Sequence, residues 1–187
     1  EHLQSRFAET QVQVTYTDLP SNDFSALFKN LLGFDSSGAN TFLTDIENVF
    51  VNACGIGFHE QLLPNETLDI GFSATAMHYI SEKPCTIDDH VHMVGASGES
   101  LAAFAQQAKR NWEDLLLARS RELRPGGRLV ILNFGIDEQG RYLGNTGGIN
   151  MFDTFAELWS NMRNEGIITS DEFQNTAFPQ YYRTVEE

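Results

Sequence analysis

Basic residues are scarce in this 187-residue sequence, which has 12 Lys and Arg against 26 Asp and Glu and a formal net charge of −14. A surface of that sign repels a phosphate backbone, so we expect no nucleic acid as partner. The sequence also lacks an apolar run close to the roughly 20 residues of a membrane span. The first residues, EHLQSRFAET, are not typical of a signal peptide. We therefore expect a soluble, cytoplasmic protein without a membrane partner.

Cysteine is equally scarce, with Cys54 and Cys85 as the two examples and no CxxC spacing. Two cysteines are too few for a disulfide scaffold, so we expect two idle or buried thiols. The chain does not begin with Met, and residues 1–9 have the pattern of a helix end. We interpret residues 1–187 as one domain that lacks its N-terminal glycine-rich motif and its C-terminal part.

Several catalytic signatures are missing. No GxSxG motif, no P-loop and no Ser/His/Asp order occurs, so hydrolase and kinase functions have no support in the sequence. The stretch DHVHM places Asp89, His90 and His92 together, but no second ligand cluster completes a tetrahedral site. We expect a solvated loop there and no bound metal.

What the sequence does contain is an alternation of strand and helix patterns. Apolar, β-branched runs predict strands at 11–18, 48–55 and 67–74, the last buried on both faces, and a fourth within 124–135. Helical spacing marks residues 23–32, about 99–123 and about 150–164, and TSDEF begins a short acidic helix. This order predicts an α/β fold with a mainly parallel sheet flanked by helices. Ligands of such sheets lie beyond the carboxyl ends of the strands.

Asp18 stands at the end of the first predicted strand. An acid at such a position commonly accepts hydrogen bonds from the ribose of a nucleoside cofactor, about 20 residues after a glycine-rich loop. Only 17 residues precede Asp18, so that loop would lie upstream of Glu1. A role of Asp18 as a helix cap or turn acid stays open. After the second strand, GIGF (55–58) allows close approach of a flat ligand on which Phe58 could stack, although a structural turn has the same pattern.

The segment FSATAMHYISEKP (72–84) is more informative. Small residues end the third strand, and His78 and Tyr79 then offer an N–H and an O–H donor suited to a carboxylate. A core histidine and an interface tyrosine are the alternative.

Together these segments resemble the SABATH family of S-adenosylmethionine-dependent carboxyl methyltransferases. DLPSNDFSALFKNL is similar to the family's DLPxNDFNxLFxxL, GIGFHEQLLP to its GSFYxRLFP, and FSATAMHYISEKP to its SSYSLHWLSxxP. The likeness continues through SRELRPGGRLVIL and NEGIITSDEFQNTAFPQYYRTVEE, and the compact GRYLGNTGGINMFDTFAELW is more typical of bacterial members. The resemblance thus covers almost the whole chain.

The resemblance implies a Rossmann-like class I methyltransferase fold with part of a helical cap, S-adenosylmethionine as cofactor, a small carboxylic acid as substrate, and a homodimer. Three positions depart from the family pattern, namely Gly57 for Ser, Thr75 for Tyr and Tyr79 for Trp. The implied cofactor contacts are Asp18, Leu19, Gly57, Phe58 and Ser73, and the implied substrate contacts are Thr75, His78, Tyr79 and Phe152.

A carboxylate is already ionised at neutral pH, since its ordinary pKa is about 4, so its methylation requires no general base. We therefore expect no catalytic acid or base, with His78 and Tyr79 positioning the substrate. Two alternatives stay open: N- or O-methylation of a small molecule with His78 as base, and an inactive cofactor-binding homologue, which the changes at Gly57, Thr75 and Tyr79 would fit. A dehydrogenase is possible on fold alone, but the residues after the third strand argue against it.

Overall fold

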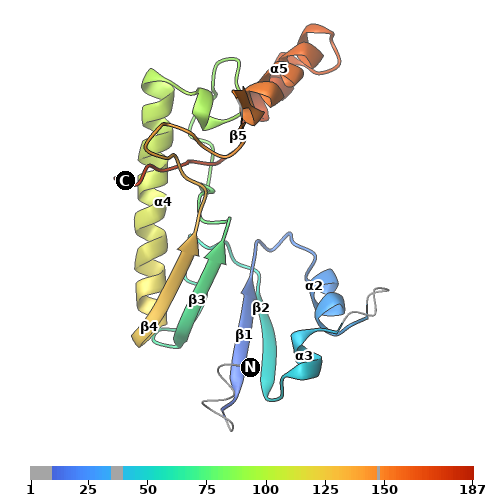
Figure 1. Ribbon diagram of the computed structural model, residues 1–187, viewed down its shortest axis with the longest axis vertical. Coiled ribbons are helices and arrows are strands. Elements are labelled where there is room, and N and C mark those ends of the chain that lie inside the picture. The colour runs from blue at the N-terminus through green and yellow to red at the C-terminus, as the bar shows by residue number, and fades with distance from the viewer. Residues whose placement is uncertain (1–9, 35–39, 147) are drawn as a thin grey trace. The chain divides into compact units, whose positions relative to one another are not determined.

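The computed structural model describes residues 10–34, 40–146 and 148–187, and it divides into two compact units, Glu1–Leu62 (unit 1) and Leu63–Glu187 (unit 2). The predicted helix end at residues 1–9 lies outside the described residues. Each unit is built on a pair of parallel strands (Figure 1).

Unit 1 contains one β–α–β arrangement. Strand β1 (Val12–Thr17) pairs in parallel with β2 (Val49–Cys54), and the connection carries α2 (Phe24–Leu31) and α3 (Phe42–Asp45). Alternating β-branched residues favour the strands. Helix α2 begins after Asp23, whose side chain accepts a hydrogen bond from the backbone N–H of Ala26 at 3.0 Å. The predicted strand, turn and helix around Asp18 are therefore confirmed, whereas α3 was not predicted.

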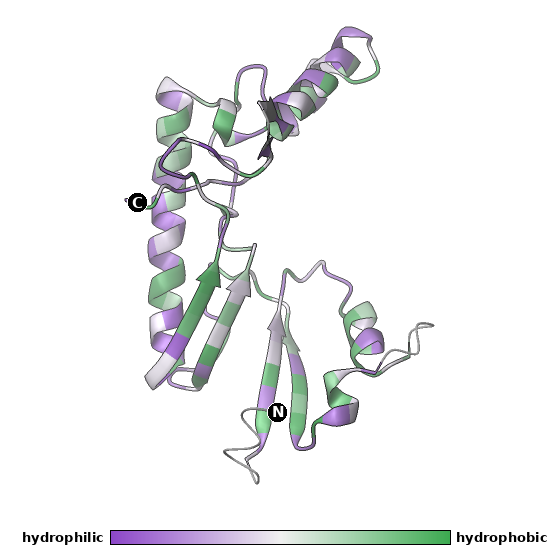
Figure 2. Ribbon diagram, in the orientation of Figure 1, coloured by the Kyte–Doolittle hydropathy of each residue, from purple (hydrophilic) through white to green (hydrophobic). Residues whose placement is uncertain are grey.

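Unit 2 repeats this arrangement with a longer helix. Strand β3 (Leu68–Ala74) pairs in parallel with β4 (Leu123–Leu132), and α4 (Gly98–Glu122) connects them and lies beside β4 (Figure 1). Hydrophobic residues dominate the carboxyl half of β4 (Figure 2). The prediction that β3 is buried on both faces is wrong, because Ile70 and Phe72 are more than half exposed.

The strand β4 begins directly after α4 and includes the Pro-Gly-Gly sequence that was expected to precede it. Gly126 has a φ of +86°, and the pairing register shifts between Leu68 and Ile70. A Cβ on Gly127 would lie 2.8 Å from the carbonyl oxygen of Leu68. Glycine is therefore required where strands β3 and β4 approach each other closely at the start of their pairing.

The rest of unit 2 follows β4. A 3₁₀ turn η1 (Met93–Gly95) precedes α4, and β5 (Asn145–Thr146) and β6 (Ile149–Asn150) form a short antiparallel hairpin before α5 (Met151–Asn164) and α6 (Ser170–Asn175). Thr169 and Glu172 close a capping box at α6, which confirms the helix start predicted from TSDEF. The hairpin was not predicted, since its strands have two residues each.

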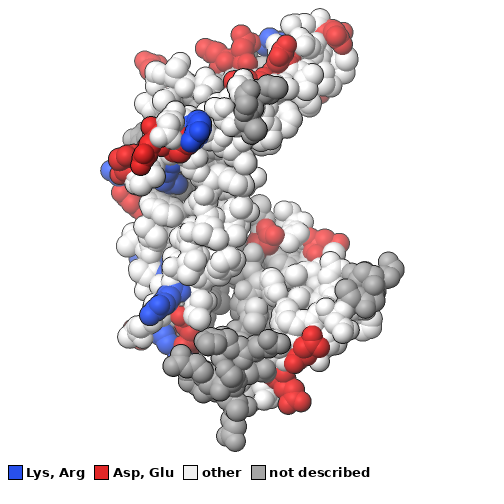
Figure 3. All heavy atoms as spheres, in the orientation of Figure 1, with Lys and Arg blue, Asp and Glu red and all other residues white. Residues whose placement is uncertain are grey.

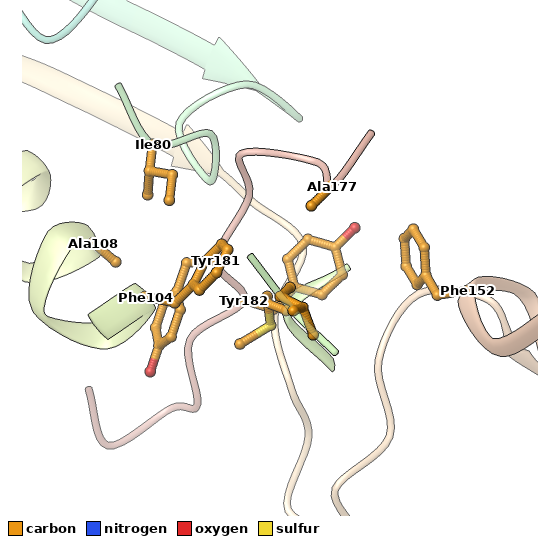
Figure 4. Packing of buried hydrophobic residues seen from close by; sticks show 9 residues of the cluster. Ile80, Phe104, Ala108, Phe152, Ala177, Tyr181 and Tyr182 are labelled. Carbon is orange, nitrogen blue, oxygen red and sulfur yellow. The ribbon is translucent and has the colours of Figure 1, made fainter. Parts of the chain in front are cut away.

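The hydrophobic core lies in unit 2, where the C-terminal tail crosses between α4 and α5. Figure 4 shows the ring of Tyr182 between Phe104 on α4 and Phe152 on α5. The tail is held by Arg183, which donates to the carbonyl oxygen of Ala108 at 2.6 Å and stacks on Trp112 at 4.7 Å. The core consists of Ile80, Ile87, Met93, Phe104, Ala108, Phe152, Ala177, Tyr181 and Tyr182.

Candidate active site

Asp18 follows β1 directly, and its backbone N–H donates to the carbonyl oxygen of Cys54 at 3.2 Å. The carboxylate therefore lies at the carboxyl ends of both strands of unit 1. Its Oδ1 accepts from the backbone N–H of Leu19 at 2.7 Å, and its Oδ2 accepts from the side-chain amide of Asn22 at 2.8 Å. The side chain is exposed. Each oxygen retains acceptor capacity for an external hydroxyl group, because an ionised carboxylate offers about four acceptor sites.

Leu19 and Gly57 lie side by side at this edge of unit 1. A Cβ added to Gly57 would lie 3.4 Å from Cδ2 of Leu19, and the Leu19 side chain is itself exposed. Phe58 is half-buried, with its ring 4.4 Å from that of His59. The structure thus places the exposed apolar side chain of Leu19 next to Asp18 and Gly57; that these residues bind a nucleoside stays a prediction.

Ser73 and Thr75 lie at the carboxyl end of β3 in unit 2. Ser73 pairs with Ile131 in the ladder, and the backbone N–H of Thr75 donates to the carbonyl oxygen of Leu132 at 2.7 Å. Thr75 has a φ of +55°, a conformation that β-branched residues rarely adopt. This backbone turn directs the chain from β3 into the segment that carries His78.

His78 is only 3% exposed, and no atom of the described residues forms a hydrogen bond with its Nδ1. Its ring lies 5.0 Å from the Tyr79 ring and 5.1 Å from the Phe134 ring. Burial lowers the pKa of His78 below its ordinary value of 6.5, and the side chain of Asn133 acts in the opposite direction. The imidazole is therefore neutral at pH 7, and its buried Nδ1 has no partner among the residues that the structure describes.

Tyr79 is 41% exposed next to this buried histidine. Its backbone forms an antiparallel bridge with Gln180, and the N–H of Ile80 donates to the carbonyl oxygen of Pro179 at 2.8 Å. The C-terminal tail therefore holds the backbone of this segment, and Tyr79 remains partly exposed.

Phe152 is the second residue of α5 and is 5% exposed. It packs among other rings of the core and stacks on His92 with ring centres 3.8 Å apart and planes 12° apart. One ring separates it from His78, because Tyr182 lies 5.5 Å from His78 and 6.1 Å from Phe152. The structure thus brings His78 and Tyr79 into direct contact and places Phe152 in the adjoining core; its predicted contact with substrate stays a prediction.

The expectation of a solvated loop at residues 89–93 is wrong for its central part. His92 is fully buried, Val91 and Met93 are buried beside it, and the ring of His90 bonds to Asp153 at 3.1 Å. The two apolar residues that alternate with the histidines were the signal for burial. Within the described part of the chain, no group of three His, Cys, Asp or Glu side chains is arranged to hold a metal ion.

A hollow of about 440 Å³ lies between α5 and the residues Val91, Thr176 and Phe178. Its lining is apolar and contains none of the predicted site residues. It is formed by Val91, Phe155, Leu158, Trp159, Met162, Thr176 and Phe178.

Comparison with solved structures gives the class of fold. The chain aligns over 98% of its length with a loganic acid methyltransferase with SAH, at a TM-score of 0.78 and 21% identity, and spans 52% of that chain. Together with the parallel strands flanked by helices, this match confirms the predicted Rossmann-like methyltransferase fold.

Comparison with sequence families gives the particular family. The SAM-dependent carboxyl methyltransferase family matches residues 1–187, and the chain belongs to this family. Relatives include indole-3-acetate O-methyltransferase 1 of Arabidopsis thaliana, 23% identical over 100% of this chain and 53% of that protein. Salicylate carboxymethyltransferase of Clarkia breweri is 27% identical over 91% of this chain and 46% of that protein. The chain thus spans about half the length of these relatives.

Proposed function

We propose that the protein transfers the methyl group of S-adenosylmethionine to the carboxylate of a small organic acid and forms a methyl ester. The observation that carries the proposal is the buried Nδ1 of His78, which has no partner in the described part of the chain, beside the exposed Tyr79. A buried polar atom without a partner costs about 1–3 kcal/mol, which a ligand that supplies the missing hydrogen bond would recover.

The acid would be held by two neutral donors. A neutral imidazole has one N–H, which Nδ1 of His78 can carry, and Tyr79 adds a phenolic O–H. Both groups can donate to an oxygen of an ionised carboxylate, and neither has to remove a proton from it. Their contribution is orientation of the attacking oxygen, and well-oriented reactants can lower a barrier by roughly 7–11 kcal/mol.

The groups of unit 1 fit the nucleoside of the cofactor. The exposed Asp18 carboxylate can accept hydrogen bonds from the two ribose hydroxyls, and Leu19 beside Gly57 offers an apolar surface for the adenine. When bound, S-adenosylmethionine supplies an electrophilic methyl group on a positively charged sulfur. Phe58 is a further proposed cofactor contact of unit 1. In unit 2, Ser73 is proposed to contact the cofactor and Thr75 the substrate.

The state of His78 favours a carboxylate over a hydroxyl or ring nitrogen as the acceptor. Methylation of a hydroxyl requires a base, and burial makes His78 a weaker base than an ordinary histidine. Transfer to a carboxylate, by contrast, should show no rate change that follows the titration of a histidine.

The test is a screen of small carboxylic acids with the protein and S-adenosylmethionine labelled in its methyl group. We expect label in a product that alkali hydrolyses, as an ester requires; alkali-stable product would instead indicate N-methylation or ether formation. Absence of both product and calorimetric binding of S-adenosylmethionine would leave the inactive homologue as the function.

The Tyr79→Phe variant tests the proposed acid contact. Loss of one hydrogen bond to a charged group should raise the KM for the acid about tenfold and change kcat less. Tyr16→Phe, which removes a phenolic hydroxyl from β1 of unit 1, is the matched control and should leave the KM for the acid unchanged. An equal KM in both variants would contradict the assignment of Tyr79.

We also propose that the protein is cytoplasmic, as its sequence leads us to expect, and that it is a homodimer, as the family likeness implies. No helix of the described residues is long and apolar enough to span a bilayer. Acidic side chains are spread over the face shown in Figure 3. Analytical ultracentrifugation at several concentrations tests the dimer, and a sedimentation coefficient of the monomer throughout would contradict it.

A further inference from the structure

A buried hydrogen-bonded network lies directly behind His78 and Tyr79. His92 is fully buried, and its Nε2 lies 3.0 Å from Oε1 of Gln180. The hydroxyl of Tyr182 donates to the same oxygen at 3.3 Å. All three side chains are at least nine-tenths buried. We call His92, Gln180 and Tyr182 the acceptor network, after the Gln180 oxygen that accepts both hydrogen bonds.

The geometry fixes the direction of each hydrogen bond. Nδ1 of His92 accepts from the backbone N–H of Val94 at 3.3 Å, so the ring hydrogen is on Nε2 and points to Gln180. Oε1 of Gln180 then accepts from both His92 and Tyr182. Burial lowers the pKa of His92 to about 4 and raises the pKa of Tyr182 to about 12, so both donors are neutral at pH 7.

The acceptor network is joined to the proposed acid-binding residues through the tail. Gln180 is the residue whose backbone pairs with Tyr79, and the N–H of Tyr181 donates to the carbonyl oxygen of His78 at 2.9 Å. The ring of Tyr182 packs edge-on against the ring of His78 at 74°. The position of both proposed donors therefore depends on three adjacent tail residues.

The far side of the acceptor network is anchored on α5. His92 stacks on Phe152, and Asn150 caps the helix by accepting from the N–H of Phe152 at 2.9 Å. The acceptor network thus contacts α5 through the stacking of His92 on Phe152, and it contacts His78 and Tyr79 through Tyr182 and Gln180. A buried, fully paired polar group of this kind specifies one arrangement of the core more strictly than apolar packing does.

We propose that His92, Gln180 and Tyr182 are positioning residues for the methyl acceptor, holding the His78 ring and the Tyr79 backbone where a carboxylate binds. This inference rests on the proposed function, since the carboxylate is the ligand that the pair would hold. The three residues do not touch the acid themselves. Their loss should consequently alter acid binding without altering the cofactor contacts of unit 1.

The first test is steady-state kinetics of Gln180→Leu with benzoate, or with the best acid from the screen. Leu removes the shared acceptor and leaves two buried donors unpaired, so the KM for the acid should rise about tenfold while the KM for S-adenosylmethionine stays unchanged. Tyr182→Phe, which keeps the ring and removes one donor, should shift the same KM in the same direction by a smaller factor. Gln180→Glu retains an acceptor oxygen and should return the KM to within about threefold of wild type.

The matched control is Gln107→Leu on α4. Gln107 is equally buried, and its side-chain amide donates to Ser81 at 3.0 Å and to Asn111 at 3.2 Å. A purely structural loss lowers the active fraction, and therefore the apparent kcat, but leaves both KM values unchanged. If Gln180→Leu behaves as Gln107→Leu does, the proposal is overturned.

The second test does not depend on turnover. Nitrogen-15 spectra of the histidine rings should show His92 as the neutral Nε2–H form from pH 5.5 to 8. The titratable groups that act on His92 are His90 and His78. Gln180→Leu should shift the ring signals of His78, and Gln107→Leu should not. If wild type forms no methyl product, the proposed function fails and these spectra still decide the network: a His92 that titrates near pH 6.5, or His78 signals that do not respond to Gln180→Leu, would overturn it.

Discussion

Asp18, which follows β1, and His78, which lies four residues after β3, differ in how many of their polar atoms have a hydrogen-bond partner. Asp18 is exposed and already bonded through both oxygens to its own turn, so a ligand adds to an existing arrangement. His78 is buried, and its Nδ1 has no partner among the described residues. An exposed carboxylate gains modestly from each added bond, whereas a buried unpaired atom gains the full value of the bond it lacked.

Asp18→Asn tests the assignment of the ribose contact. The amide keeps the shape of the side chain but loses the charge and one acceptor, so the Kd for S-adenosylmethionine should rise about tenfold. Asp23→Asn, which removes the same charge five residues away and preserves an effective helix cap, should leave the Kd unchanged. Isothermal titration calorimetry measures both, and equal affinities would remove Asp18 from the cofactor site.

For individual residues, the sequence was a better guide to candidate hydrogen-bond donors than to which side chains are buried. The donors His78 and Tyr79 could be named because small residues and a strand end precede them. Their environments could not, because the tail that buries His78 lies about 100 residues further along the chain. For the same reason His92 was assigned to solvent, although its partner Gln180 and its stacking partner Phe152 both come from distant segments.

At the scale of the elements, α5 is linked to the core through its first turn, which contains Phe152. Asn150 accepts from the backbone N–H of Phe152 at 2.9 Å and of Asp153 at 3.4 Å. Its amide group also donates to the hydroxyl of Tyr142. One side chain therefore begins the helix and fixes the preceding loop to it.

Asn150→Ala should lower the free energy of unfolding by about 1 kcal/mol, since it removes the cap of α5. Asn150→Asp, which can accept the same two hydrogen bonds, should recover most of the loss. Urea unfolding followed by tryptophan fluorescence measures the effect, because Trp112 and Trp159 both belong to unit 2. Equal destabilisation by Ala and Asp would show that the cap is not the stabilising contact.

The regular elements follow from local patterns. The boundaries of the four predicted strands and of the helices at 98–122 and 151–164 agree with the structure to within a few residues. The sequence did not predict the partners of polar residues on α4. In the structure Arg119 is buried and bonds to Glu122 at 2.7 Å, which in turn accepts from the N–H of Leu63 at 3.2 Å. Helical periodicity alone does not distinguish a buried ion pair from a solvated one.

Acidification has two opposing effects on the stability of the whole molecule. Protonation of carboxylates reduces the self-repulsion that accompanies a net charge of −14, which favours the compact state. Histidines that are buried in the neutral form act the other way. Burial lowers the pKa of both His78 and His92, so the unfolded chain binds protons more readily at these two sites.

His92 should make the stability of the protein depend on pH, because burial lowers its pKa from 6.5 to about 4. The stability that neutral His92 contributes is fully present above pH 6.5, and it is lost as the pH falls from 6.5 to about 4, because the unfolded state takes up the proton first. The shift corresponds to about 3 kcal/mol over that window. His92→Phe, which keeps a ring against Phe152, should be less stable than wild type at pH 7.5 but lose less stability on acidification. Urea unfolding of both proteins at pH 7.5 and 5.0 measures the difference, with His90→Gln as control. Parallel losses of stability in wild type and His92→Phe would show that the titration of His92 does not contribute to the acid sensitivity.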